Sequence, residues 1–122
     1  MHLLTRIIFA TLVLSISQFT YASPAQKTVE TLHQEMSALS GKQIQVKGKV
    51  VKVNNGIMNR NFLHIQDGTG NDGSNDLIIT SQQTANIGDE VMVTGTVVTD
   101  TDFGFGYAYP LLVEKATIEA VK

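Results

Sequence analysis

The spacing of the hydrophobic residues changes at Gly41. Before that glycine, apolar side chains recur every three or four residues between positions 28 and 39, with polar and charged residues between them. Such spacing places them on one face of an α-helix. These apolar positions are Val29, Leu32, Met36 and Leu39. The segment is therefore predicted to be a single amphipathic helix that ends near Gly41.

Beyond Gly41 hydrophobic residues alternate with polar ones, which is the pattern of half-buried β-strands. Five segments have this alternation or a strand-like composition, namely residues 43–53, 62–67, 77–80, 91–98 and 111–121. The apolar face changes within the first segment at Val50-Val51, and the nearby Gly48 is expected to let the strand bend. Asn54-Asn55-Gly56 is predicted to be a turn, and residues 99–110 an aromatic, glycine-rich loop. Five short strands predict an all-β barrel or sandwich.

The first 22 residues have the pattern of a cleavable signal peptide. A short segment with one cation, Arg6, precedes an apolar run over residues 7–16 that only Thr11 and Ser15 interrupt. The run is too short to span a membrane, and Thr20-Tyr21-Ala22 places small residues where a signal peptidase reads them. We therefore expect cleavage after Ala22, export to the periplasm and no membrane anchor in the mature chain.

Charge and composition narrow the function classes. Removing residues 1–22 takes away Arg6 and no acidic residue, so the formal charge moves from −2 to about −3. This mild acidity disfavours a partner held mainly by phosphate neutralisation, because nucleic-acid-binding domains usually carry a basic excess. The chain has no cysteine, which excludes disulfides, thiolate metal sites and thiol nucleophiles. Roughly one hundred mature residues suffice for one domain with one core.

Two local patterns select one fold among the small all-β folds. The second predicted strand runs into Gln66-Asp67-Gly68-Thr69-Gly70, and the fourth begins with Gly88-Asp89-Glu90 and meets Gly95. In these features the chain resembles the OB-fold. It is similar, more closely, to small exported bacterial OB-fold proteins, some of them encoded beside periplasmic respiratory enzymes. The shared segments are residues 48–53, 56–58, 61–70, 75–77, 103–107 and 109–110.

The resemblance covers residues 41 to about 117 and includes the preceding helix. It implies a five-stranded OB-fold barrel preceded by one N-terminal amphipathic α-helix. The expected division is a signal peptide over residues 1–22, the helix within residues 23–40 and the barrel over residues 41–122. Only residues 81–87 separate the third and fourth strands, which is too short for the helix commonly found there. We expect the N-terminal helix to cover the open end of the barrel instead.

The histidines are the first candidates for catalysis. The mature chain has two, His33 in the predicted helix and His64 in the second strand. Neither has a hydroxyl residue and an acid at a spacing typical of a nucleophile, its base and an orienting group. We therefore expect no enzymatic activity and no cofactor.

The loop from Asp67 to Asp76 is rich in side-chain oxygens and is the candidate for metal binding. Counted as a calcium loop from Asp67, it has Asp72 where the sharp-turn glycine belongs and Ile78 where the bidentate glutamate belongs. The composition is equally that of an ordinary Asp, Asn and Gly turn cluster. We expect no metal site.

A ligand-binding face is predicted on the outside of the second strand and on the aromatic loop. In the OB architecture the ligand lies across strands two and three, between the loops that follow strands one and four. Aromatic rings beside cations stack on extended ligands. The candidate ligand-binding residues are Arg60, Phe62, His64, Gln66, Lys47, Lys49, Phe103, Phe105, Tyr107 and Tyr109.

Two interpretations of these aromatic residues stay open. The rings either fold back and cap the barrel or stack on a ligand, and Asp100 and Asp102 in the same loop would repel phosphate. The sequence therefore predicts a non-catalytic periplasmic OB-fold binding or accessory protein whose ligand is a protein partner or another extended ligand. The alternative is binding of single-stranded nucleic acid or a nucleotide by the same face.

Overall fold

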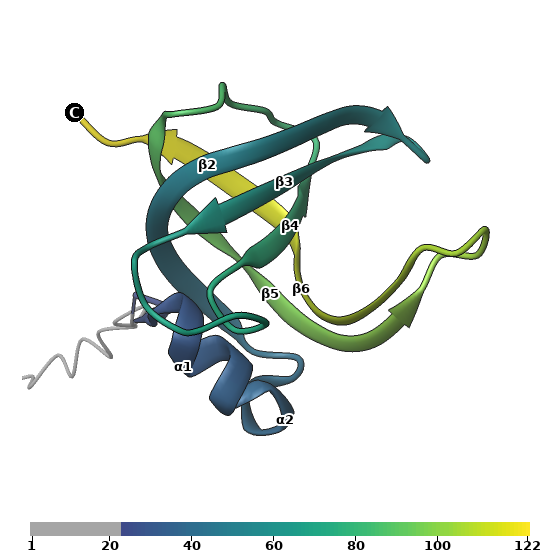
Figure 1. The fold of residues 1–122 in the computed structure, drawn as a ribbon, viewed down its shortest axis with the longest axis horizontal. Coiled ribbons are helices and arrows are strands. Elements are labelled where there is room, and N and C mark those ends of the chain that lie inside the picture. Colours follow the sequence, from purple (N-terminus) through teal and green to yellow (C-terminus); the bar gives the residue numbers. More distant parts are fainter. Residues whose placement is uncertain (1–22) are drawn as a thin grey trace, which may run out of the picture.

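The computed structural model describes residues 23–122 (Figure 1). The predicted signal peptide and its cleavage after Ala22 lie outside the described residues. In the part that is described, no helix has the length and apolar character needed to cross a membrane.

The described residues form one sheet and two short helices. The helices are α1 (Val29–Gln34) and α2 (Met36–Leu39), and the strands are β1 (Ala25–Gln26), β2 (Gln43–Ile57), β3 (Arg60–Gln66), β4 (Leu77–Ser81), β5 (Glu90–Asp102) and β6 (Ala108–Ala120). The strand order is β1-β2-β3-β4-β6-β5, and a further pairing of β2 with β5 closes the sheet on itself (Figure 1). The prediction of an all-β architecture is confirmed.

The predicted number of strands is wrong by one. Residues 23–122 contain six strands, because Ala25–Gln26 adds a two-residue strand that pairs in parallel with β2 at Ile44 and Gln45. Two residues are too few to show an alternating pattern in the sequence. The other five strands form the closed ring.

Strand β2 is long enough to belong to both sides of the closed sheet. Its first half, up to Lys49, pairs with β5, and from Lys49 onward it pairs with β3. The register with β3 shifts between Val50 and Lys52, which is the bulge expected where the apolar face changes. A Cβ atom on Gly48 would lie 3.0 Å from the backbone oxygen of Gln66, so a glycine lets the bent strand approach β3.

Both hairpins extend further than predicted. Asn54, Asn55 and Gly56 belong to β2, and the turn lies at Met58–Asn59, whose φ angles of 50° and 62° match a two-residue hairpin turn. The aromatic loop is also shorter, since β5 reaches Asp102 and β6 begins at Ala108. The polar residues in these extensions are held in the sheet by pairing with the opposite strand of the hairpin. The hydrophobic pattern along one strand does not reveal such pairing. The two hairpins project to the same side of the molecule (Figure 1).

The predicted single helix is two helices with a break at Glu35, whose φ is −107°. Thr28 caps α1 by accepting a hydrogen bond from the Thr31 N–H. The N–H of Gly41 donates to the Val97 C=O at 2.7 Å, and this hydrogen bond links the segment that follows α2 to β5. The helices lie against one end of the closed sheet (Figure 1), and their buried residues Val29, Leu32 and Leu39 join the core. The expected covering role is confirmed.

Candidate functional site

Four aromatic rings from two separate elements pack together, and we call them the aromatic cluster. Phe62 comes from β3, and Phe103, Tyr107 and Tyr109 come from the β5–β6 hairpin. The Phe62 ring centroid lies 5.8 Å from that of Phe103, 6.4 Å from that of Tyr107 and 5.7 Å from that of Tyr109. These separations are typical of favourable aromatic pairs. The cluster therefore joins the outer face of β3 to the hairpin.

Arg60 extends the cluster with a cation. Its guanidinium carbon lies 4.5 Å from the centroid of the Phe103 ring, within the range of a cation–π interaction. Among residues 23–122, Arg60 has no acidic partner within salt-bridge distance. Its N–H groups are therefore available to a ligand.

The predicted aromatic residues divide into packed and displayed rings. Phe62 is only 3% exposed and lies beneath the hairpin rings, whereas Tyr107 is 39% exposed and Phe105 is 96% exposed. Phe103 and Tyr109 are half-buried. The pKa of the Tyr109 hydroxyl lies above its ordinary value. The main cause is burial of the group, and the second is its electrostatic interaction with nearby Tyr107. Some rings therefore cover β3, as expected if they cap the barrel, and others face solvent, as expected if they stack on a ligand.

The tip of the hairpin holds Phe105 in an uncommon backbone conformation. Gly104, Phe105 and Gly106 have φ angles of 82°, 55° and 83°. The left-handed region is uncommon for a bulky residue and costs free energy. The tip is closed by hydrogen bonds from the Phe103 N–H to the Tyr107 C=O (2.8 Å) and from the Tyr107 N–H to the Gly104 C=O (3.0 Å). The ring of Phe105 is therefore presented by an ordered turn.

His64 and Gln66 form a second, polar group around Asp76. Nδ1 of His64 lies 2.6 Å from Oδ2 of Asp76, and Nε2 of Gln66 donates to Oδ1 of the same carboxylate at 3.2 Å. His33 in α1 reaches the backbone oxygen of Asp76 through its Nε2, at 2.7 Å. Sequence reasoning treated Asp76 only as a member of an oxygen-rich loop. Its position directly before β4, which pairs with β3, is the signal that could have identified it as the partner of His64.

Lys47 and Lys49 are exposed on β2, apart from the rings. Lys49 lies opposite Gln66, and Lys52, which sequence reasoning did not single out, lies opposite His64. Lys47 and Lys49 line a shallow hollow that also contains the acidic residues Glu90 and Asp67. The structure thus brings Arg60 together with the aromatic cluster, and places the predicted lysines in a separate row of mixed charge.

Asp67 has a structural role at the start of α1. Its carboxylate accepts hydrogen bonds from the Val29 N–H at 2.9 Å, from the Thr69 N–H at 3.0 Å and from the Thr69 hydroxyl at 2.5 Å. Burial alone would raise the pKa of Asp67, but these hydrogen bonds together hold it below its ordinary value of 3.8. Within residues 23–122, no group of three or more His, Cys, Asp or Glu side chains is placed to hold a metal ion.

Replacing Asp67 with asparagine should lower the free energy of unfolding by about 1–2 kcal/mol at pH 7. The reason is that a charged carboxylate accepts hydrogen bonds at the start of α1 more strongly than a neutral amide oxygen does. A carboxyl whose pKa is lowered by folding stabilises the protein above its unfolded-state pKa and loses that effect as the pH falls through the folded-state pKa. The difference between wild type and Asp67→Asn should therefore be complete at pH 7 and smaller at about pH 3. Urea unfolding at both pH values measures it. A difference of equal size at the two pH values would contradict a role for the charge.

Comparisons with known proteins bear on the fold. No family model and no curated protein matches the chain. An OBody bound to hen egg-white lysozyme aligns with a TM-score of 0.58 at 12% identity, over 83% of this chain and 98% of that one. A second lysozyme-bound OBody gives 0.56 at 14% identity, over 83% of this chain and 98% of that one.

A larger protein contains a similar unit. A chain assigned as an aspartyl-tRNA synthetase from Leishmania major Friedlin aligns with a TM-score of 0.57 at 15% identity. The match covers 86% of this chain but only 22% of that one. At these identities the similarity concerns the fold alone. The chain has an OB-like fold.

Proposed function

We propose that this chain is a non-catalytic binding protein, exported to the periplasm, that holds a protein partner or another extended ligand on its aromatic hairpin. The observation that carries the proposal is the display of Phe105 and Tyr107, which are 96% and 39% exposed. The ring of Phe105 stands on an ordered turn with an uncommon backbone conformation. Strained backbone conformations cluster at sites that contact ligands, which is why the display of Phe105 supports a binding role.

The arrangement around these rings suits a binding hot spot. Aromatic residues and arginine dominate the energetics of protein interfaces, and here Arg60 stands over Phe103 beside the displayed rings. The packed members of the aromatic cluster hold the hairpin against β3, so the contact surface is organised before a ligand arrives. The OBodies, which share the fold, are bound to hen egg-white lysozyme. Such complexes support a protein as one ligand for a domain of this shape.

The proposal of a non-catalytic role rests on how the histidines are used. His33 and His64 both contact Asp76, one through its backbone oxygen and the other through its carboxylate. Within residues 23–122 neither histidine is hydrogen-bonded to a serine or threonine hydroxyl that it could activate. Export is supported by the apolar run and the small residues that end at Ala22.

Binding of single-stranded nucleic acid is the second candidate. The exposed Lys47, Lys49 and Lys52 favour it, because they form a row of cations on β2 that can follow a phosphate backbone. Asp100 and Asp102 beside the hairpin and the net negative charge oppose it. A nucleic-acid complex should weaken steeply between low and physiological salt. If single-stranded DNA causes no shift in mobility even at low salt, this candidate is excluded.

Affinity capture from a periplasmic extract tests the main proposal. The wild type is compared with the Phe105→Ala, Tyr107→Ala double variant and with Ile87→Ala. Ile87 is a suitable control because it is also a large exposed hydrophobic residue, at 68%, and belongs to the loop between β4 and β5. This loop lies on a different side of the closed sheet from the β5–β6 hairpin (Figure 1). A partner retained by wild type and Ile87→Ala but lost by the double variant would support the proposal. Capture that all three proteins perform equally would contradict it.

A further inference from the structure

Two hollows meet at Tyr109 and Pro110, near the start of β6, and we call them together the β6 groove. The first hollow, of about 460 Å³, extends toward α1 and β4, and its lining includes Met36 and Ile78. The second, of about 310 Å³, lies against the end of β5 and is lined by residues 100–102 and 108–110. Because Tyr109 belongs to the aromatic cluster, the β6 groove adjoins the hairpin that carries the displayed rings.

The first hollow is suited to an apolar side chain. Ile78 is half-buried on the outer face of β4, and Met36 and Leu111 line the same hollow. Methionine side chains adapt their shape to different neighbours. The His33 and Asp76 side chains in this hollow are already hydrogen-bonded to other described residues. An apolar group can therefore enter without leaving them unpaired, and its burial is favourable.

The second hollow carries an uncompensated negative charge. Asp100 and Asp102 line it and are exposed. Neither carboxylate forms an ion pair with another residue of the described range 23–122, and no lysine or arginine lines either hollow of the β6 groove. Such a site attracts a cation and repels phosphate or an acidic segment.

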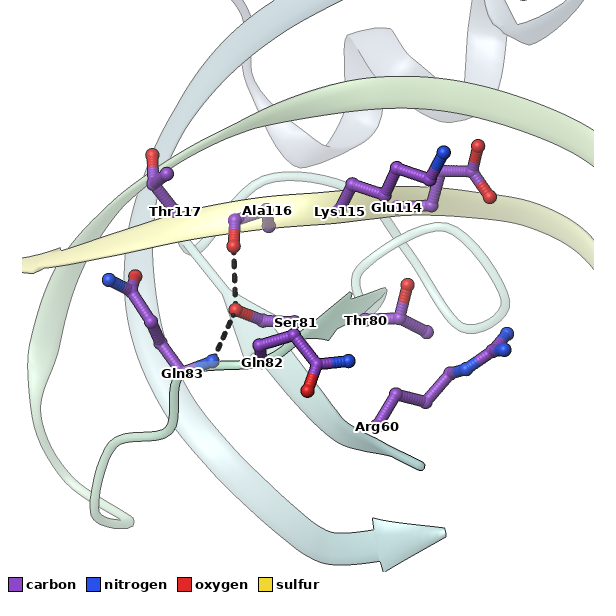
Figure 2. Close-up of a pocket in the computed structure, with 9 residues that line it drawn as sticks. All are labelled: Arg60, Thr80, Ser81, Gln82, Gln83, Glu114, Lys115, Ala116 and Thr117. Atoms are coloured by element: carbon purple, nitrogen blue, oxygen red, sulfur yellow. Dashed lines mark hydrogen bonds between the residues drawn. The ribbon is translucent and has the colours of Figure 1, made fainter. Parts of the chain in front are cut away.

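A third hollow near the hairpin lacks this bias. It measures about 480 Å³ and opens between β4 and β6, above Thr80. Figure 2 shows Glu114 and Lys115 on one side of it and Arg60 on the other. Both signs of charge are present there, so the lining favours neither a cationic nor an anionic ligand. The β6 groove, in contrast, combines an apolar hollow with a negative one.

We propose that the partner docks through a basic peptide segment that lies extended along the β6 groove. One apolar side chain of the segment fills the hollow beside Met36 and Ile78, and a lysine or arginine one or two positions away lies against Asp100 and Asp102. This inference rests on the proposed function and names the chemical class of the partner. Cations also interact favourably with aromatic faces, which the neighbouring Tyr107 supplies.

Titration of the ¹⁵N-labelled chain with short blocked peptides tests the inference by NMR. The probes are Lys-Lys-Leu-Lys-Lys, its acidic counterpart Glu-Glu-Leu-Glu-Glu, and Lys-Lys-Ser-Lys-Lys, each added up to about 10 mM. We expect the first to bind with a dissociation constant of about 1 mM and to shift the backbone amides of Met36, Ile78 and Asp100. The serine peptide should bind about tenfold more weakly, because it lacks the buried leucine, and the acidic peptide should not bind.

Substitutions at the two ends of the same strands separate a local contact from the overall charge. Asp100→Asn with Asp102→Asn should weaken binding of the basic peptide about tenfold, the combined effect of two exposed ion pairs. Asparagine at 102 can still accept the hydrogen bond from the Gly104 N–H. The control is Glu90→Gln with Glu119→Gln, which changes the net charge equally at the opposite end of β5 and β6. It should leave the affinity unchanged.

Several results would overturn the inference. They are equal binding of the acidic or the serine peptide, amide shifts confined to residues outside the β6 groove, and equal losses of affinity in the two double variants. If no peptide binds but a partner is still captured through Phe105 and Tyr107, the inference fails and the proposed function stands. If the basic peptide binds through Asp100 and Asp102 but capture of a partner does not depend on the rings, the groove stands and the role of the hairpin fails.

Discussion

The free energy of unfolding should fall by about 3–5 kcal/mol when Phe62 is replaced with alanine, which is the range for removing a buried phenylalanine side chain. Phe62 is 3% exposed and contacts the rings of Phe103, Tyr107 and Tyr109. Its removal would leave a cavity under the hairpin and end three ring contacts at once. Urea unfolding followed by far-UV circular dichroism measures the loss.

Phe105→Ala is the matched control for this prediction. It removes the same side chain from a site that is 96% exposed, so its effect on stability should stay within about 0.5 kcal/mol. The comparison separates packing from ligand contact for residues that sequence reasoning grouped together. If Phe62→Ala keeps its stability and loses only partner binding, Phe62 is a ligand contact and the packing role is wrong.

The case of Phe62 shows what alternation in a sequence can and cannot reveal. The alternation over residues 62–66 assigned Phe62, His64 and Gln66 to the opposite face from Leu63 and Ile65, and the structure has Leu63 and Ile65 in the core. Alternation does not reveal what covers the outer face. The covering rings belong to a hairpin some forty residues away, and the packing of two distant segments is a tertiary property.

The fold was predictable to the extent that it depends on local pattern. The helix start and the bend near Gly48 follow from spacing and glycine placement. The covering role of the helices was expected from the resemblance to the OB-fold and from the short segment 81–87. The hairpin ends were missed because Asn54, Asn55 and Asp102 are poor strand formers that tertiary pairing keeps in the sheet. The site was predictable in residue type, whereas the partnership of His64 with Asp76 and the hollow above Thr80 depend on where β3, β4 and β6 meet.

The strongest effect on function is expected from the displayed rings. Alanine substitution of both Phe105 and Tyr107 should weaken partner binding by about 30-fold or more, since loss of interface hot-spot residues costs about 2 kcal/mol or more. The affinity loss should come mainly from faster dissociation, as is usual for changes within one interface. Surface plasmon resonance with the captured partner measures both rates.

The reason for expecting so large an effect is the organisation of the hairpin before binding. Gly104 and Gly106 hold the turn at positive φ, and the Phe103 and Tyr107 N–H groups close it by hydrogen bonds, so little freedom is lost when a ligand arrives. The double variant should therefore lose affinity while its free energy of unfolding falls by no more than about 1.5 kcal/mol, the value of the lost Phe62–Tyr107 ring contact. Ile87→Ala should leave the affinity unchanged. An affinity loss in Ile87→Ala as large as that in the double variant would mean that exposed hydrophobic area in general, and not the hairpin, holds the partner.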